Sequence, residues 1–160
     1  MIRVLTSSEE QTRAVGRRLA SVLGGGDVVL LVGGLGAGKT TFVKGMAEGL
    51  GYEGEVTSPT FTLCHCYPGR LDLVHVDMWR LERVDEIRDL ALEEDLEGGA
   101  VLVAEWGEAA EGVFGEGALQ VLFGAGASVE CRELTFDPAP AWAGRSEQLA
   151  AAVAGNPCGT

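Results

Sequence analysis

One segment of the sequence has the residue types and the spacing of a phosphate-binding loop. Gly33 is followed, after four residues, by Gly38, Lys39 and Thr40, which fits the pattern G-x-x-x-x-G-K-[ST]. Glycines let successive backbone N–H groups turn toward phosphate oxygens, and a lysine ammonium at this position can reach the β- and γ-phosphates. The threonine hydroxyl can bind Mg²⁺. The candidate nucleotide-binding residues in the loop are Gly33, Gly34, Leu35, Gly36, Ala37, Gly38, Lys39 and Thr40.

The residues on both sides of the loop support this interpretation. The run Val28 to Val32 is apolar and short, as in a buried strand, and Thr40 to Leu50 has the pattern of a helix. The N-terminus of that helix would lie beneath the phosphates, where its free N–H groups and its dipole favour an anion. A flexible glycine turn would not need this context. The sequence therefore predicts a protein that binds a nucleoside triphosphate.

Hydrolysis of such a nucleotide requires carboxylates that hold Mg²⁺ and orient the attacking water. In open α/β sheets these side chains stand at the carboxyl ends of buried strands. Asp77 follows the expected strand Leu71 to Val76, and Glu105 follows Val101 to Ala104. Solvated residues at strand ends are the alternative for both. We predict Glu105, Asp77 and Lys39 as catalytic residues, and Thr40, Asp77 and Glu105 as ligands of the metal.

Two further residues are candidates near the nucleotide. Thr60 lies in Ser58-Pro59-Thr60, between the loop helix and the Asp77 strand, where switch segments of phosphate-loop proteins usually lie. It could contact the γ-phosphate or Mg²⁺, although a plain Ser-Pro turn is the alternative. His75 fits a packed strand residue, and a polar contact near the nucleotide is its alternative role.

The sequence lacks the motif that recognises guanine, which favours adenine as the base of the bound nucleotide. Guanine-specific phosphate-loop proteins use Asn/Thr-Lys-x-Asp, but the only asparagine is Asn156 and neither Lys39 nor Lys44 is followed by Asp two residues later. We therefore expect ATP or ADP, with Mg²⁺, as the bound cofactor.

Composition restricts the class of protein. The 160 residues suffice for a single domain with a core, 1–160, with a disordered tail expected over about 155–160. The net charge of −12 disfavours direct binding of DNA or RNA. No apolar run is long enough to span a membrane and no signal segment is evident, so we expect a cytoplasmic protein. Its cysteines should then be thiols, and Cys64-His65-Cys66 fits structural strand residues better than a metal site.

The remaining elements place these motifs in an α/β fold. A capped helix is expected after Thr6-Ser7-Ser8, and a hairpin is expected from two strands, Phe61–Tyr67 and Leu71–Val76. Later elements are an acidic helix over Leu81–Leu96, strands at Ala100–Ala104, Ala118–Phe123 and Val129–Phe136, and a helix over Gly144–Ala154. We predict a three-layer P-loop NTPase domain with a mostly parallel central sheet and antiparallel hairpin additions.

Taken together, the motifs resemble those of the TsaE (YjeE) family of bacterial ATPases. The similarity lies in order and spacing over roughly Thr6 to Trp142, and the combination is far more specific than the loop alone. The matching segments are Leu35–Phe42, Val56–Phe61, His75–Leu81, Asp85-Glu86, Leu92–Glu94 and Val103–Trp106.

The resemblance implies a function and partners. It implies an ATPase that supports threonylcarbamoyl transfer to adenosine 37 of tRNA in an assembly with TsaB and TsaD, where TsaD performs the transfer and tRNA is met only through the complex. It implies that Lys39, Thr40 and Thr41 hold phosphates and Mg²⁺, that Asp77 and Glu105 act at the metal and the attacking water, and that Trp106 takes part at the nucleotide. A small-metabolite P-loop kinase is the alternative, as is a nucleotide-dependent binding module without useful turnover.

Overall fold

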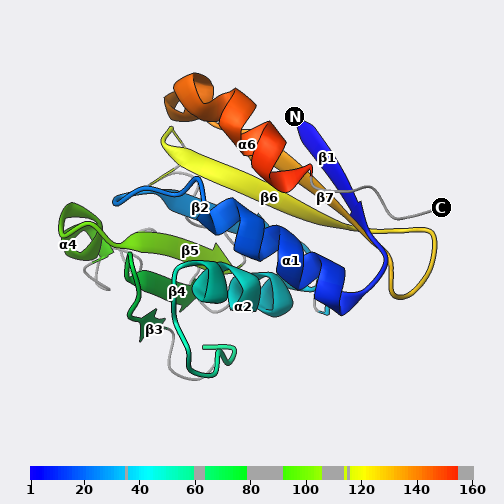
Figure 1. Ribbon diagram of the computed structural model, residues 1–160, viewed down its shortest axis with the longest axis horizontal. Coiled ribbons are helices and arrows are strands. Elements are labelled where there is room, and N and C mark those ends of the chain that lie inside the picture. The colour runs from blue at the N-terminus through cyan, green and yellow to red at the C-terminus, as the bar shows by residue number, and fades with distance from the viewer. Residues whose placement is uncertain (35, 60–63, 79–91, 106–113, 115, 155–160) are drawn as a thin grey trace.

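The computed structural model describes residues 1–34, 36–59, 64–78, 92–105, 114 and 116–154 (Figure 1). Its elements in chain order are β1 (Ile2–Thr6), α1 (Glu9–Ala20), β2 (Val28–Val32), α2 (Lys39–Gly49), β3 (Cys64–Tyr67), β4 (Leu73–Asp77), α4 (Leu92–Glu97), β5 (Val101–Glu105), β6 (Ala118–Ala125), β7 (Arg132–Pro138), the 3₁₀ helix η2 (Pro140–Arg145) and α6 (Ser146–Val153).

The described strands form one seven-stranded sheet in the order β1-β7-β6-β2-β5-β4-β3. The four central strands β6, β2, β5 and β4 are parallel to one another. The strands at both edges are antiparallel: β3 pairs with β4, and β7 pairs with β6 and β1. The predicted α/β fold, with a parallel centre and antiparallel additions, is confirmed.

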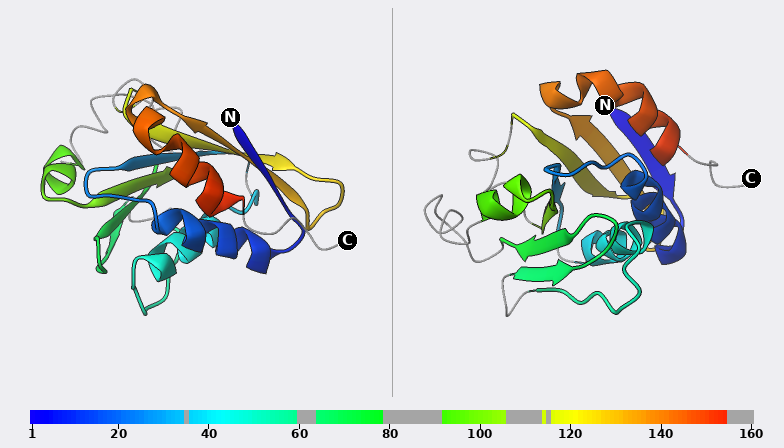
Figure 2. Two further views of the ribbon diagram at one scale, coloured as in Figure 1. Left: turned by 45° about the horizontal axis from the view of Figure 1, so that its top comes forward. Right: turned by 60° about the vertical axis from the view of Figure 1, so that its left-hand side comes forward.

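Apolar side chains pack on both faces of this sheet, which gives the predicted layers. One face buries a core against α1, α2 and α6, with Phe42, Trp142 and Leu149 among its members. The other face carries a second cluster that includes Leu92 of α4 and Leu30 of β2. Figure 1 shows α1 and α2 side by side across the sheet, and the two views of Figure 2 show how α6 and α4 lie around it. The helix that follows the phosphate-binding loop is therefore anchored in the larger core.

Helices α1 and α2 approach so closely that glycine is required where they cross. A Cβ atom at Gly45 would lie 1.9 Å from the carbonyl oxygen of Arg13, and one at Gly16 would lie 2.2 Å from the carbonyl oxygen of Phe42. Both neighbours are backbone atoms, which cannot rotate away as a side chain would. The close contact fixes α2, and with it the loop, against α1.

We expect Gly45→Ala to lower the free energy of unfolding by about 1–3 kcal/mol, because the new methyl group must push two helix backbones apart. Urea denaturation followed by circular dichroism measures this change. Gly144→Ala is the matched control, since no atom lies within 4 Å of a Cβ at that position. Equal stability of the two variants would show that the helix crossing tolerates the methyl group.

The structure differs from the sequence prediction at the N-terminal strand, at the last hairpin and at the C-terminal helix. Ile2–Thr6 forms strand β1, which the sequence did not predict because its partner β7 lies at the far end of the chain. The expected strand Val129–Phe136 begins only at Arg132, because the backbone of Cys131 closes the hairpin turn with Ser128 and Gly126. The expected helix Gly144–Ala154 is α6 preceded by the 3₁₀ helix η2, in which a proline occupies the first turn.

The predicted hairpin and the orientation of its cysteines are confirmed by the strand register. Cys64 and Cys66 lie opposite Val76 and Val74, whereas His65 lies opposite His75 on the other face. Burial, followed by the charge of Asp95, raises the pKa of the Cys64 thiol. No group of three or more metal-ligating side chains gathers among the described residues, here or elsewhere. In the same part of the chain, no helix is long and apolar enough to cross a membrane.

Candidate functional site

The phosphate-binding loop joins the end of β2 to the start of α2. Gly36 and Gly38 have positive φ angles of 74° and 99°, which L-residues with a side chain rarely adopt. Gly38 is the N-cap of α2 and provides no side-chain acceptor, so the first N–H groups of the helix stay available to an anion. Leu35 lies outside the described residues. Two glycines of the predicted motif therefore adopt backbone conformations that favour glycine.

The Lys39 side chain lies across the loop and is almost fully buried, with 6% of its surface exposed. Its Nζ donates to the carbonyl oxygens of Gly33, at 2.5 Å, and Gly34, at 3.0 Å. These contacts hold a fixed cation beside the backbone that would surround the phosphates. Lys39 can therefore stabilise negative charge on a bound triphosphate without a large rearrangement.

Thr40 and Glu105 meet beside the loop. The Thr40 hydroxyl donates to Oε1 of Glu105 at 2.8 Å, linking the first turn of α2 to the carboxyl end of β5. Asp77, at the end of β4, is paired in register with Glu105. Both residues are buried: 4% of the surface of Asp77 and 3% of that of Glu105 is exposed. Of the three residues that the sequence predicted as metal ligands, Thr40 and Glu105 are in contact, and Asp77 stands beside Glu105 on the neighbouring strand.

The surroundings of Glu105 favour its charged form. Burial alone would raise the pKa of this carboxyl group, but the interaction with the nearby His75 ring opposes burial most strongly. The Thr40 hydroxyl and the Lys39 ammonium act in the same direction as His75, and the pKa of Glu105 lies below its ordinary value. Glu105 is therefore an anion at neutral pH, able to bind a cation or to orient a water molecule.

The donor atoms at this position fit magnesium. Carboxylate and hydroxyl oxygens are hard ligands, and Mg²⁺ keeps several waters and uses phosphate oxygens for the rest of its shell. Thr40 with one or both carboxylates supplies what the protein side of such a site requires.

A cavity of about 510 Å³ opens beside the loop and was not predicted from the sequence. Arg132 of β7 forms one wall, and its Nε and Nη2 donate to the carbonyl oxygens of Ala37 and Gly36 at 3.0 and 3.2 Å. Ser8 and Thr12 of α1 and the β6–β7 hairpin complete the cavity. Its lining residues are Ser8, Glu9, Glu10, Thr12, Gly36, Gly38, Thr41, Val129, Glu130 and Arg132.

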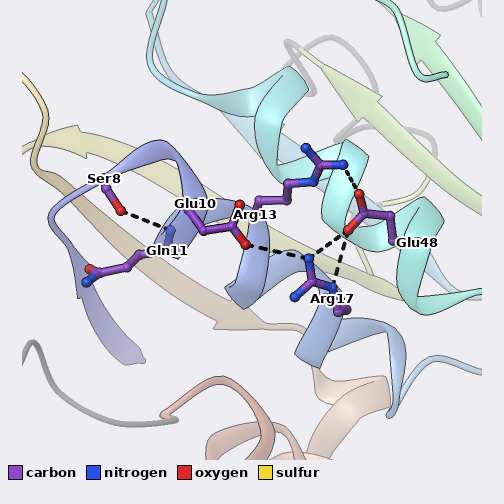
Figure 3. A network of polar contacts seen from close by, with 6 residues as sticks. All are labelled: Ser8, Glu10, Gln11, Arg13, Arg17 and Glu48. Atoms are coloured by element: carbon purple, nitrogen blue, oxygen red, sulfur yellow. Dashed lines mark hydrogen bonds and ion pairs between the residues drawn. The ribbon is translucent and has the colours of Figure 1, made fainter.

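The wall formed by α1 is held in place by polar contacts with α2 (Figure 3). Ser8 caps α1 by accepting from the backbone N–H of Gln11 at 3.2 Å. Glu48 of α2 binds Arg13, and it also binds Nη2 of Arg17 at 2.8 Å. These partly exposed pairs add little to stability individually. They do orient the helix that carries Ser8 and Thr12 relative to the helix that carries Lys39 and Thr40.

The residues of the candidate site thus fall into three groups: those found where predicted, those outside the described residues, and those that were not predicted. Lys39, Thr40, Asp77 and Glu105 lie where the sequence predicted them, and Thr41 lines the cavity. Leu35, Thr60 and Trp106 lie outside the described residues, so their roles stay predictions. Ser8, Thr12 and Arg132 were not predicted as site residues, because the only local signals were a helix cap for Ser8 and the alternating pattern of a strand for Arg132.

Comparison with known proteins gives one consistent result. Residues 6–132 match the family model described as "Threonylcarbamoyl adenosine biosynthesis protein TsaE". A protein named "tRNA threonylcarbamoyladenosine biosynthesis protein TsaE" from Treponema pallidum is 46% identical over 107 residues, which are 67% of this chain and 79% of that protein. The protein of the same name from Bacillus subtilis is 43% identical over 132 residues, 82% of each chain.

A solved structure supports the same relationship. The crystal structure of Bacillus subtilis YdiB superposes with a TM-score of 0.75 and 34% sequence identity, and the match covers 95% of this chain and 93% of that one. Agreement over nearly the whole length shows that the fold extends beyond the segment matched by the family model.

Proposed function

The chain belongs to the TsaE family, and from this premise we propose that it is a Mg²⁺-dependent ATPase subunit that supports threonylcarbamoyl transfer to adenosine 37 of tRNA. The observation that carries the proposal is the contact between the Thr40 hydroxyl and the Glu105 carboxylate beside the Lys39 ammonium. A cation, a hydroxyl and an ionised carboxylate at the mouth of a phosphate-binding loop form the polar set that ATP hydrolysis uses.

Each residue has a distinct role in this proposal. Lys39 neutralises charge on the β- and γ-phosphates as it develops during transfer to water. Bound Mg²⁺ would supply further positive charge at the phosphates, held by Thr40 with Glu105 and Asp77. The two carboxylates also orient the attacking water, because they stand next to each other on neighbouring strands. After ATP hydrolysis we expect ADP to stay bound in the loop.

We infer that the cavity beside the loop receives the nucleoside. It adjoins Gly36, Gly38 and Thr41, so a nucleotide with its phosphates in the loop would extend its ribose and base into this cavity. The volume of about 510 Å³ is in the range of small-ligand sites. Arg132 offers a guanidinium face for stacking with a base and also braces the loop through two carbonyl groups.

Arg132→Ala is expected to weaken ADP binding about tenfold, because the variant loses both the stacking surface and the support of the loop. Isothermal titration calorimetry with ADP and Mg²⁺ measures the dissociation constant. Arg3→Ala is the control, since Arg3 is an exposed residue of β1. If both variants bind ADP as the unchanged protein does, the nucleoside does not occupy this cavity.

The direct test of the activity is turnover by the isolated chain. We expect slow hydrolysis of ATP that stops when EDTA removes Mg²⁺, and binding of ATP or ADP at least about tenfold tighter than binding of GTP or GDP. Phosphate release and calorimetric titration measure the two quantities. Equal affinity for adenine and guanine nucleotides would contradict the choice of ATP. Absence of any turnover, with or without partner proteins, would contradict the enzyme.

The partners follow from the family and from charge. We propose that the chain works with TsaB and TsaD in the cytoplasm and reaches tRNA only through that assembly. Its net charge of −12 opposes a strong direct contact with a nucleic acid backbone. The transfer chemistry then belongs to TsaD, and this chain provides ATP turnover.

A further inference from the structure

We propose that His75 is a positioning residue that orients the Glu105 carboxylate for ATP hydrolysis. This inference rests on the proposed ATPase function and assigns a role to a buried group that the mechanism above does not use. His75 lies in β4, between β5 and β3, with no surface exposed to solvent. Its Nε2 faces Oε1 of Glu105 at 3.6 Å.

The burial of His75 calls for an explanation. Neither Nδ1 nor Nε2 has a hydrogen-bond partner within 3.5 Å among the described residues. A buried polar atom without a partner costs about 1–3 kcal/mol, so an apolar residue would make a more stable strand here. A small movement of the Glu105 side chain would close the 3.6 Å separation into a hydrogen bond. His75 thus holds a ring nitrogen close to the Glu105 carboxylate. We expect that carboxylate to move toward it when it acts in hydrolysis.

The imidazole ring is held from its other side by the edge hairpin. His65 of β3 pairs in register with His75, and the Tyr67 ring centroid is 6.1 Å from that of His75. The Tyr67 hydroxyl itself is engaged, donating to the carbonyl of Thr57 at 3.1 Å and lying 3.1 Å from Nδ1 of His65. Packing therefore directs the Nε2 edge of His75 toward Glu105.

Glu105 Oε1 is thus approached by two groups, the Thr40 hydroxyl at 2.8 Å and His75 Nε2. Once the 3.6 Å separation closes, two donors on one oxygen would restrict rotation of the carboxylate, as outer-shell groups commonly do at metal sites. Because Thr40 is also a candidate ligand of Mg²⁺, His75 is the donor that serves orientation alone.

Two amide substitutions test the role of one nitrogen atom. A glutamine at position 75 places an N–H₂ group where Nε2 stands, whereas an asparagine places it where Nδ1 stands. We expect His75→Gln to keep kcat within roughly threefold of the unchanged protein and His75→Asn to lower kcat about tenfold to a hundredfold. The dissociation constant for ADP should stay within about twofold in both, since neither change touches the loop.

Equal loss of kcat in the two variants would overturn the proposal, because a merely structural histidine would not distinguish the two nitrogen positions. ADP binding reports whether each variant is folded. If the unchanged protein hydrolyses no ATP, the proposed function fails instead, and the spectroscopic test still shows whether His75 presents a donor to Glu105.

The spectroscopic test uses the unchanged chain and needs no activity. The sequence contains two histidines, so a ¹⁵N-histidine spectrum has two sets of signals, and His65→Gln identifies those of His75. We expect a proton on Nε2, because the group facing an ionised carboxylate must be the donor. An imidazole that is protonated only on Nδ1 would present a lone pair to Glu105 and would refute the positioning role.

Discussion

Replacement of Lys39 with alanine is expected to abolish measurable ATP turnover, with a loss of about 10³-fold or more. Lys39 is buried, with 6% of its surface exposed, and its ammonium group donates to two carbonyl groups of the loop, so alanine removes a cation that is held at the expected phosphate position. Charge-assisted contacts to phosphate are about twice as strong as neutral ones. ADP binding should weaken as well, because the β-phosphate loses the same cation.

The chain offers a matched control for this substitution. Its one other lysine is Lys44, which lies one turn further along α2 and outside the loop. Lys44→Ala should hydrolyse ATP at a rate close to that of the unchanged protein. Steady-state phosphate release from both variants gives the comparison. Retained hydrolysis in Lys39→Ala would show that Gly33 to Thr40 is not the nucleotide site.

Glu105→Gln is expected to slow ATP hydrolysis by about 10²-fold or more while ADP still binds. Glutamine keeps the size of the side chain and an oxygen that can accept from Thr40, so the fold and the loop should persist. The variant loses the negative charge that its surroundings maintain at neutral pH by holding the pKa of Glu105 low. Binding of Mg²⁺ and orientation of the attacking water both require the negative charge of Glu105.

Single-turnover hydrolysis and ADP titration separate the two effects of this change. Glu97→Gln, on the exposed end of α4, is the control for loss of one negative charge from an acidic protein. If Glu105→Gln turned over ATP normally, the carboxylate would have only a structural role, and Asp77 would be the remaining candidate. Loss of ADP binding in this variant would instead show that Glu105 contributes to binding of the nucleotide and not only to its hydrolysis.

Much of the site could be predicted from the sequence because its chemistry is local. Gly38, Lys39 and Thr40 are adjacent, and the loop conformation depends on residues within a few positions of each other. Asp77 and Glu105 are far apart in sequence, but each ends a buried apolar run. The carboxyl ends of parallel strands meet at one edge of a sheet, so strand direction predicted that both lie at this edge, and the pairing of β4 with β5 makes them neighbours.

The cavity beside the loop could not be predicted in the same way. Arg132 reaches Ala37 from 95 residues away, and its position depends on the pairing of β7 with β6 and β1. The residues next to an arginine in a strand do not indicate such a long-range contact. The same holds for β1, whose five residues gain a partner only when the end of the chain folds back on them.

His75 shows an intermediate case. Its place in an apolar strand correctly suggested burial, and the sequence left open a polar contact near the nucleotide. Only the register of β4 with β5, and the contacts of Thr40 and Glu105, identify the group that its ring nitrogen faces.

The measurement that tests the central claim most directly is a reconstitution in which each component is left out in turn. ATP turnover and threonylcarbamoylation of tRNA are followed with this chain, TsaB, TsaD, ATP and Mg²⁺. We predict slow turnover by this chain alone, faster turnover when TsaB and TsaD are added, and sustained tRNA modification only when all three proteins and ATP are present. Modification of tRNA by this chain alone, or ATP turnover that ignores both partners, would contradict the account of an accessory ATPase.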